Sequence, residues 1–257
     1  AATHLQGRRV VFGDVACDPR ASAFGMAKTH EFWLRFDPAP LAPAAVEAWA
    51  ASCQLPAIAP ADPEHACATG VVRLTHPAAP ARWPEAEAGL EAMFDALLDG
   101  PVARDRLYGM VDYGDLLNAH GRAHGYTYRV FARAPGVKIT DLIGWYNNEC
   151  FDNCYTQWLT YVRTGQRKYW RLAEAYSEHL EDVDTVHAAG PRPEELGLSH
   201  YHNILHWSAG ASHSHSPVNG WLLHYYLTGN RRALEVARQT ADNAVNTQEP
   251  AGVVSNR

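Results

Sequence analysis

The sequence has few charged side chains and no cluster of basic ones. Asp, Glu, Lys and Arg make up 19% of the 257 residues, and the formal net charge is -6. A nucleic-acid-binding domain carries a basic patch that neutralises phosphates, and no Lys/Arg run supplies one here. The composition therefore argues against a nucleic-acid partner. An acidic ligand would need a local group of cations rather than the field of the whole protein.

Long apolar runs are also missing. No stretch approaches the roughly 20 consecutive apolar residues of a membrane-spanning helix, so we expect no membrane partner. The N-terminus reads AATHLQ and contains no recognisable signal peptide, which leaves a processed or truncated start open.

Cysteine is sparse, and its spacing does not form a metal site. The five residues are odd in number and include no C-x-x-C pair, so we expect no thiolate zinc site. Cys53 and Cys67 enclose a Pro/Ala-rich loop and are candidates for a disulfide if the protein is exported. Cys150 and Cys154 lie one helical turn apart, which favours two side chains in a core over a bridge.

Histidine, by contrast, is abundant and clustered. Five of the fourteen histidines fall within sixteen residues: His200, His202, His206, His213 and His215. Histidine transfers protons near neutral pH and ligates metals, so we interpret this segment as a functional surface. The alternative is that single histidines bond loop backbone or line a core. We therefore treat the segment as a site without making each histidine catalytic.

The pattern along the chain predicts a mainly α protein with a β-rich start. Residues 8–16 and 29–37 are rich in Val and aromatics, as strands are. A Pro/Ala-rich connector with one short helix near 43–52 follows. We divide the chain into this β-rich segment and connector, 1–84, and a helical domain, 85–257. Apolar periodicity and stop signals predict helices over 85–99, 148–163, 166–182, 217–227 and 230–247.

A weak internal repeat organises the helical domain. The segment 159–168 (LTYVRTGQRK) matches 223–232 (LHYYLTGNRR) at an offset of 64 residues. In each copy a helix ends at Thr-Gly and a second helix begins at once, because glycine adopts the left-handed C-cap conformation readily. The repeat predicts two helical hairpins, the unit from which an α/α toroid is built.

The repeat also aligns polar residues that precede each hairpin. At the same offset Glu149 aligns with His213, and Asp152 aligns with Ser216. We expect the segments 145–149 and 213–215 to meet at one mouth of the toroid, where the first turns of inner helices lie together. The alternative is that Asn148, Asp152 and Ser216 are simply helix N-caps.

With these residues in hand, the chain resembles the exo-acting rhamnogalacturonan lyase family of polysaccharide lyases. Seven stretches carry the resemblance: 25–31, 108–115, 145–152, 161–165, 179–187, 213–215 and 220–229. The resemblance implies a β-sandwich strand at 25–31 and a C-terminal α/α toroid. The helical region supplies about three of the five to seven hairpins of a complete toroid. The toroid is therefore expected to be incomplete, with a further chain or missing domains completing it.

The resemblance implies β-elimination at a uronate of an acidic, pectin-like polysaccharide. This reaction removes the C5 proton, protonates the leaving oxygen and needs stabilisation of the developing enolate. The candidates for the base are His213 and His215, and those for the acid are Tyr146 and Tyr201. Lys28, Asn147 and Asn148 are candidate carboxylate clamps, and His30, His202 and Trp145 complete the expected substrate-binding set. Structural alternatives exist: Lys28 and His30 would rim a strand, Asn148 would cap a helix, and Tyr146 would lie in the core.

A divalent cation such as calcium is a second way to stabilise the enolate, and the cofactor is left open. His202 and His206 are four residues apart and would share a helical face, as zinc ligands do, but no H-E-x-x-H motif accompanies them. Four aspartates offer oxygen ligands without an EF-hand pattern: Asp112, Asp115, Asp182 and Asp184.

Two other functions fit the same residues. A glycoside hydrolase on the same scaffold would need two carboxylic acids across the cleft, and Glu149 with Asp115 is the candidate pair. A non-catalytic carbohydrate-binding or assembly subunit would show no turnover. The substrate class leads us to expect a secreted or periplasmic location.

Overall fold

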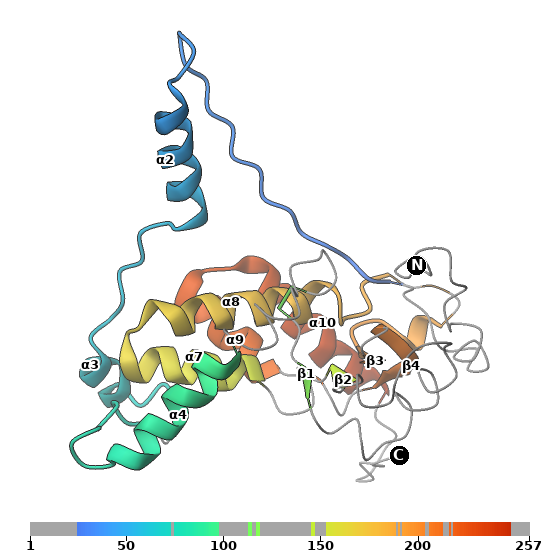
Figure 1. The fold of residues 1–257 in the computed structure, drawn as a ribbon. Helices are drawn as coiled ribbons and strands as arrows, with labels where there is room; N and C mark the ends of the chain where they lie inside the picture. Colours follow the sequence, from blue (N-terminus) through green and yellow to red (C-terminus); the bar gives the residue numbers. More distant parts are fainter. Residues whose placement is uncertain are drawn as a thin grey trace, which may run out of the picture.

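The structure is a computed structural model in which the following residues are described: 25–72, 75–97, 113–114, 117–118, 145–146, 153–188, 190, 192–203, 206–212, 216 and 218–247. Several of these are described for their backbone alone, namely 97, 117–118, 145–146, 201–203, 206–210, 212 and 247. Helices dominate the described part of the chain (Figure 1).

Two helical hairpins form the body of the domain. The first joins α7 (Asn153–Thr164) to α8 (Arg167–Asp182), and the second joins α9 (Val218–Thr228) to α10 (Arg231–Thr247). Helix α7 packs against α8 and α9, and α10 packs against α9 and α8, so the two hairpins lie side by side (Figure 1). This arrangement confirms the predicted α/α-toroid class, and all four helices start and end within five residues of their predicted bounds.

The two Thr-Gly turns have the same backbone geometry. Gly165 has φ 66° and donates its N–H to Tyr161 O at 2.7 Å, while Gly229 has φ 76° and donates to Tyr225 O at 2.8 Å. These are left-handed C-cap glycines, as the repeat predicted. Each glycine lets the chain reverse within two residues.

The threonine before each glycine fixes the turn through its hydroxyl. Thr164 Oγ1 donates to Thr160 O at 2.7 Å and accepts from the N–H of Gln166 at 3.2 Å. Thr228 Oγ1 likewise donates to His224 O at 2.6 Å and accepts from the N–H of Asn230 at 3.0 Å. The repeat is therefore a structural unit, because both hydroxyls join the end of one helix to the start of the next.

The core between the hairpins is rich in aromatic side chains. Trp158 and Trp221 are fully buried, and Trp158 Nε1 donates to Ser177 Oγ at 2.9 Å, which satisfies its polar atom. Helix α4 (Pro84–Leu97) adds Phe94, whose ring meets Tyr169 edge to face at 4.9 Å. Cys154 is a buried free thiol, as expected; its neighbour in the sequence pattern, Cys150, lies outside the described residues.

A β-hairpin that the sequence analysis did not predict connects the two helical hairpins. Strand β3 (Ser199–Asn203) pairs antiparallel with β4 (His206–Ser212), and His202 is opposite Trp207. His202 and His206 therefore lie on two strands rather than on one helical face, and the expectation of a shared helical face is wrong. A second small ladder pairs β1 (Leu117–Asn118) with β2 (Trp145–Tyr146).

The predicted strand over 29–37 is also wrong. These residues are extended and exposed, with Phe32 and Phe36 at 85% and 91% exposure, and no strand pairs with them in the described part of the chain. An extended segment becomes a strand only where a partner takes its backbone hydrogen bonds. The other predicted strand, 8–16, lies outside the described residues.

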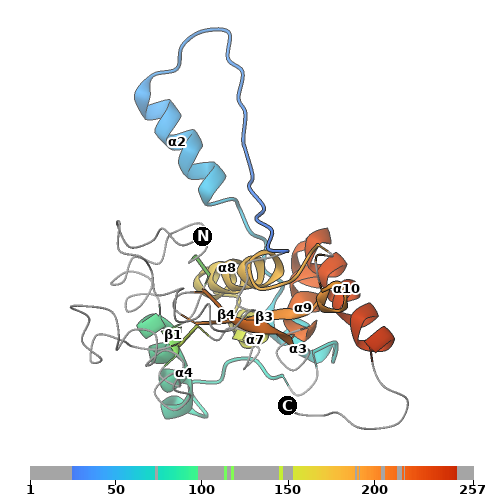
Figure 2. The ribbon, with the colours of Figure 1, turned by 90° about the vertical axis from the view of Figure 1, so that its right-hand side faces the viewer.

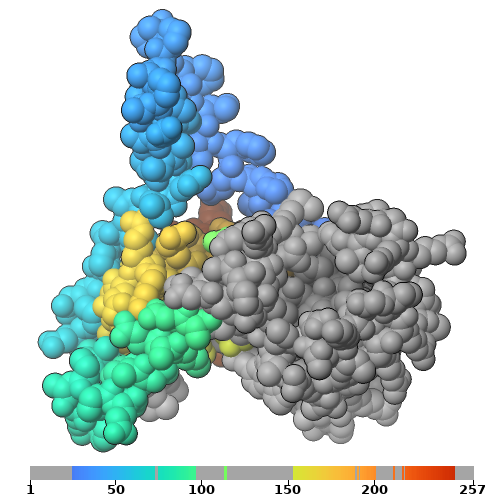
Figure 3. Space-filling view, in the orientation of Figure 1, coloured from blue at the N-terminus to red at the C-terminus, as the bar shows by residue number. Residues whose placement is uncertain are grey.

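The extended segment leads to a helix that stands away from the body. Helix α2 (Pro43–Gln54) confirms the short helix expected near 43–52, and none of its residues is buried. Two views show it as an arm above the hairpins (Figure 1, Figure 2), and the space-filling view shows the same projection (Figure 3). The chain returns to the body at α3 (Pro63–Ala68), which is capped by Asp62 and packs on α7.

Cys53 in α2 and Cys67 in α3 carry free thiols, so the pairing considered for an exported chain is not made. No helix in the described part of the chain is long and apolar enough to cross a membrane.

Candidate functional site

Two segments that are distant in sequence meet beside the body. Strand β2, with Trp145 and Tyr146, contacts strand β3, which carries Tyr201 and His202. Strand β2 precedes α7, and β4 leads from β3 toward α9. The contact therefore lies on the chain segments that enter the two hairpins, the end where the repeat predicted the mouth.

The N-terminal segment reaches the same region. Gly25 O accepts from the N–H of His187 at 2.8 Å, and the N–H of Ala27 donates to Asp182 O at 3.0 Å. Gly25 has φ 88°, and a Cβ there would lie 2.8 Å from Val186 Cγ1, so only glycine allows this close approach. Lys28 consequently lies beside the C-terminal end of α8.

The loop after α8 links this segment to the β-hairpin. Thr185 bridges to Ser199, and the N–H of His200 donates to Asp184 O at 2.6 Å. The backbone of 25–29, the loop 183–187 and the start of β3 therefore form one continuous scaffold under the hairpin.

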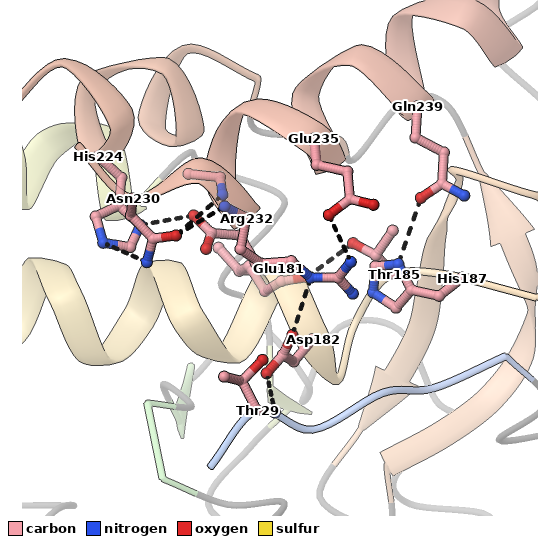
Figure 4. Close-up of polar contacts among 12 residues, drawn as sticks. Thr29, Glu181, Asp182, Thr185, His187, His224, Asn230, Arg232, Glu235 and Gln239 are labelled. Atoms are coloured by element: carbon pink, nitrogen blue, oxygen red, sulfur yellow. Dashed lines mark hydrogen bonds and ion pairs between the residues drawn. The ribbon is translucent and has the colours of Figure 1, made fainter. Parts of the chain in front are cut away.

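Asp182 is the polar centre of this scaffold. Its carboxylate is buried and accepts from the backbone N–H of Thr29, and Arg232 Nε of α10 lies 3.3 Å from the other oxygen (Figure 4). A charge-assisted pair of this kind holds its partners firmly when desolvated. Asp182 thus fixes the backbone on one side of Lys28 and joins it to the second hairpin.

His30, by contrast, belongs to the projecting arm. It is exposed, and its ring lies 6.4 Å from that of Phe32. The expected role of His30 beside Lys28 at a sugar site stays a prediction.

A second buried contact, between Glu181 and His224, joins α8 to α9. Glu181 Oε1 and His224 Nδ1 are 2.7 Å apart, and both side chains are almost fully buried (Figure 4). Trp158 stacks on the imidazole at 5.3 Å with an interplanar angle of 20°. Burial raises the pKa of Glu181, and the hydrogen bond to His224 opposes that rise.

Asn230 determines which nitrogen of His224 carries the proton. Its Oδ1 accepts from the N–H groups of Arg232 and Ala233, so its amide nitrogen faces His224 Nε2, at 3.4 Å. Because that amide nitrogen only donates, Nε2 is the acceptor and Nδ1–H donates to Glu181. Helices α8, α9 and α10 meet at this node.

A third pair, His179 with Asp184, anchors the 113–114 turn to α8. His179 Nε2 lies 3.3 Å from Asp184 Oδ1, and its Nδ1 lies 3.1 Å from Tyr113 O. A Cβ at Gly114 would lie 2.1 Å from Ala175 O, so this turn requires glycine. The three buried carboxylates of α8 and its loop therefore serve as structural anchors.

These features match a known family. A family model described as the PcRGLX-like protein C-terminal alpha/alpha toroid domain matches residues 56–256. The chain belongs to the PcRGLX-like family. Residues 56–256 thus form the α/α toroid domain of rhamnogalacturonan lyase-like proteins, in agreement with the toroid part of the resemblance. Sandwich strands are not found among the described residues.

One relative of this PcRGLX-like chain is an uncharacterized protein, YetA, of Bacillus subtilis (strain 168). The two are 26% identical over 245 residues, which is 93% of this chain and 26% of the relative. The chain therefore spans about a quarter of the length of that protein.

Apart from the exposed His30, the expected site residues of the PcRGLX-like chain fall into three groups. Trp145, Tyr146, Tyr201 and His202 lie on the two strands that meet, where the backbone alone is described. Lys28 lies at the end of α8. The third group lies outside the described residues: Asn147, Asn148, Glu149, His213 and His215, together with Asp112 and Asp115.

The candidate metal ligands that the structure describes do not lie together. No group of three or more His, Cys, Asp or Glu side chains able to hold a metal ion occurs in the described part of the chain. Asp182 is occupied by Thr29 and Arg232, and Asp184 faces His179. These two aspartates therefore have structural partners in place of a shared cation.

Sequence reasoning did not single out Glu181, His224, Asn230 or Arg232. A signal was present only for His224, which follows Leu223 in a largely apolar helix; Glu181 shares its face of α8 with Ser177 and Glu178. Buried polar side chains are nearly always hydrogen-bonded. That rule could have suggested a partner for His224, although not the identity of that partner.

Proposed function

We propose that this domain forms part of a polysaccharide lyase that cleaves an acidic, pectin-like chain by β-elimination at a uronate. The observation that carries the proposal is the contact between β2 and β3 in a toroid of rhamnogalacturonan lyase-like proteins. That contact brings two tyrosine-bearing strands together on the chain segments that lead into the two hairpins.

The roles follow from what the elimination requires. A neutral histidine, His213 or His215, removes the C5 proton, and a tyrosine, Tyr146 or Tyr201, protonates the leaving oxygen. Glu149 is the residue that would serve a hydrolase instead, together with Asp115. Trp145 and His202 line the sugar site from the two strands.

Lys28, Asn147 and Asn148 neutralise the uronate carboxylate in this proposal. Lys28 is supported by its backbone position, because Asp182 holds Thr29 and Ala27 on either side of it. A cation that is fixed before substrate binds stabilises the enolate without reorganisation in the transition state. A divalent cation such as calcium would supply the same positive charge, held by carboxylate oxygens.

The full activity is proposed for a larger assembly than this chain. The chain covers 26% of its relative, so further domains or a further chain would complete the toroid and the cleft. From the proposed substrate class we also propose a secreted or periplasmic location.

The test incubates the protein with rhamnogalacturonan I and with other uronate polysaccharides while the absorbance of the unsaturated product is followed. A rise in absorbance that is lost in His213→Ala and His215→Ala supports elimination, and loss of the rise with a chelator assigns a metal. Release of reducing ends without absorbance, abolished by Glu149→Gln, would replace the lyase by a hydrolase. No turnover on any of these polysaccharides would leave a binding role.

A further inference from the structure

A cavity lies at the end of the first hairpin that is opposite the β2–β3 contact. It has a volume of about 380 Å³ and is lined by the last turns of α7 and α9, by the first half of α8, and by the segment that leads to α3. Helix α7 has 12 residues, so its two ends are separated by about 18 Å. The cavity is therefore distinct from the proposed mouth.

Three aromatic side chains line this cavity: Tyr161, Trp170 and Tyr226. The rings of Tyr161 and Trp170 are 5.1 Å apart at 76°, and Trp170 also meets the buried Trp158 edge to face at 5.2 Å. Packing against the core therefore holds these two rings nearly perpendicular to each other in the absence of a ligand. Tyr226 is 65% exposed and stands at the rim.

One carboxylate shares the cavity with these rings. Glu174 Oε2 accepts from Trp170 Nε1 at 3.2 Å, which fixes the acid beside the aromatic wall. A negative charge here repels an anionic ligand and accepts hydrogen bonds from hydroxyl groups. The cavity therefore suits a neutral ligand with one apolar face and several hydroxyls.

The remaining wall of the cavity is formed by the segment that leads to α3. The segment 56–61 is held by Arg167, whose guanidinium donates to Pro56 O at 2.6 Å, and by the capped α3 behind it. Its lining residues are Pro56, Ala57, Ile58, Ala59 and Ala61. The small side chains leave the space between this segment and the aromatic rings open.

We infer that this cavity is a second carbohydrate-binding site, which holds a neutral sugar unit of the polysaccharide away from the reacting bond. The C–H face of a sugar ring stacks on an aromatic ring, and its hydroxyls bond to Glu174. The identity of the polysaccharide rests on the proposed function, whereas the preference for a neutral unit rests on Glu174. The site would keep a long chain bound while its end reacts at the mouth.

The indole N–H of Trp170 reports directly on this cavity because it is bonded to Glu174. We would follow its NMR signal, assigned with Trp170→Phe, while titrating rhamnogalacturonan I oligosaccharides, homogalacturonan oligosaccharides and choline chloride. The first probe contains neutral sugar units, the second contains acidic units only, and the third is a cation suited to an aromatic cage. A shift of this signal with the first probe alone is the expected result.

Variants at the rim separate binding from folding. Tyr226→Ala should weaken the binding of the oligosaccharide about fivefold or more, since an aromatic contact contributes about 1 kcal/mol. Glu174→Gln should also weaken it, because the hydrogen bonds from the sugar hydroxyls lose their charged acceptor. Tyr226→Phe, which keeps the ring, should bind the oligosaccharide nearly as well as the wild type. Trp83→Ala is a control at a tryptophan outside the cavity, with 56% exposure, and should leave the binding unchanged.

The inference is overturned if both cavity variants titrate like the wild type, if homogalacturonan shifts the signal equally, or if choline alone does so. Its failure is distinguishable from that of the proposed function. A Trp170 shift without any absorbance rise would remove the lyase and keep this site. An absorbance rise without a Trp170 shift would do the opposite.

Discussion

The two helical hairpins have the same type of turn but differ in the side chains around that turn. Both reverse at Thr-Gly, with the same threonine hydroxyl contacts and the same left-handed glycine. At the second helix of each hairpin, Asn230 caps α10 through its side chain whereas Gln166 leaves α8 without a side-chain cap. Thr160 in the first hairpin corresponds to His224 in the second. The repeat therefore preserves the backbone reversal, and substitutions around it create a buried polar node in one copy only.

Breaking that node should have the largest effect on stability. Glu181→Ala leaves the buried Nδ1–H of His224 without its acceptor, and an unsatisfied buried donor costs up to about 3 kcal/mol. Urea unfolding followed by circular dichroism measures the loss. Arg171→Ala, at an exposed position of the same helix, should stay within about 0.5 kcal/mol. Equal losses for the two variants would contradict a special role for the node.

Replacing the turn glycines tests what the hairpins have in common. Gly165→Ala and Gly229→Ala should each lower the unfolding free energy by about 1 to 2 kcal/mol, because an alanine is strained at positive φ. Neither added Cβ meets an atom closer than 3.6 Å, so strain alone should make the two losses similar. Thermal or urea unfolding of both variants measures this.

Gly89 provides the matched control for these substitutions. It lies inside α4 with open space around its Cβ position, so Gly89→Ala should raise the unfolding free energy by about 0.5 to 1 kcal/mol. A loss at Gly89, or a gain at either turn glycine, would refute the conformational argument.

The cap difference should sharpen the contrast between the hairpins. Asn230→Ala removes the N-cap of α10 and the contact to His224 Nε2, and should cost about 1 kcal/mol. Gln166→Ala removes no cap and should cost less than about 0.5 kcal/mol. The same unfolding experiment compares them. Similar costs would show that the second hairpin does not depend on its cap.

The pH dependence is the smallest expected difference and concerns the contact between the loop after α8 and helix α10. Burial, with the nearby Arg232 charge, lowers the pKa of His187, whose Nδ1 lies 3.3 Å from Gln239 of α10. The unfolded chain therefore binds this proton more readily, near the ordinary value of 6.5. The contribution of His187 to stability is present above pH 6.5 and is lost as the pH falls.

Comparing unfolding at pH 7.5 and pH 5.5 measures this contribution. The wild type should lose more stability on acidification than His187→Gln, which retains a polar side chain and has no titratable ring. If both proteins respond identically to pH, the buried imidazole is not the group responsible.

Much of the helical fold could be predicted because its signals are local. The bounds of α7 to α10 follow from apolar periodicity and from Thr-Gly stops, which depend on neighbours within a few residues. The β3–β4 hairpin was missed because its histidines were interpreted as a functional site with a helical spacing, although β4 (HWSAGAS) does alternate polar and apolar residues. The strand expected over 29–37 was inferred from composition, and composition does not supply a pairing partner.

Less of the site could be predicted. The repeat and the resemblance indicated the segment around Tyr146, and the histidine cluster indicated the segment around Tyr201. The structure brings the strands of these two segments together. The cavity beside Trp170 was not anticipated, because it is lined by residues from 56 to 228 that share no sequence pattern.

The sequence by itself determined the helical hairpins, their lengths and their reversals, because propensity, capping and glycine conformation act over a few residues. Tertiary structure alone decided that Asp182 holds Thr29, 153 residues away, and that Glu181 meets His224 across 43 residues. A buried charge can be recognised in a sequence as needing a partner. The identity of that partner depends on how the helices pack, and no local interaction encodes it.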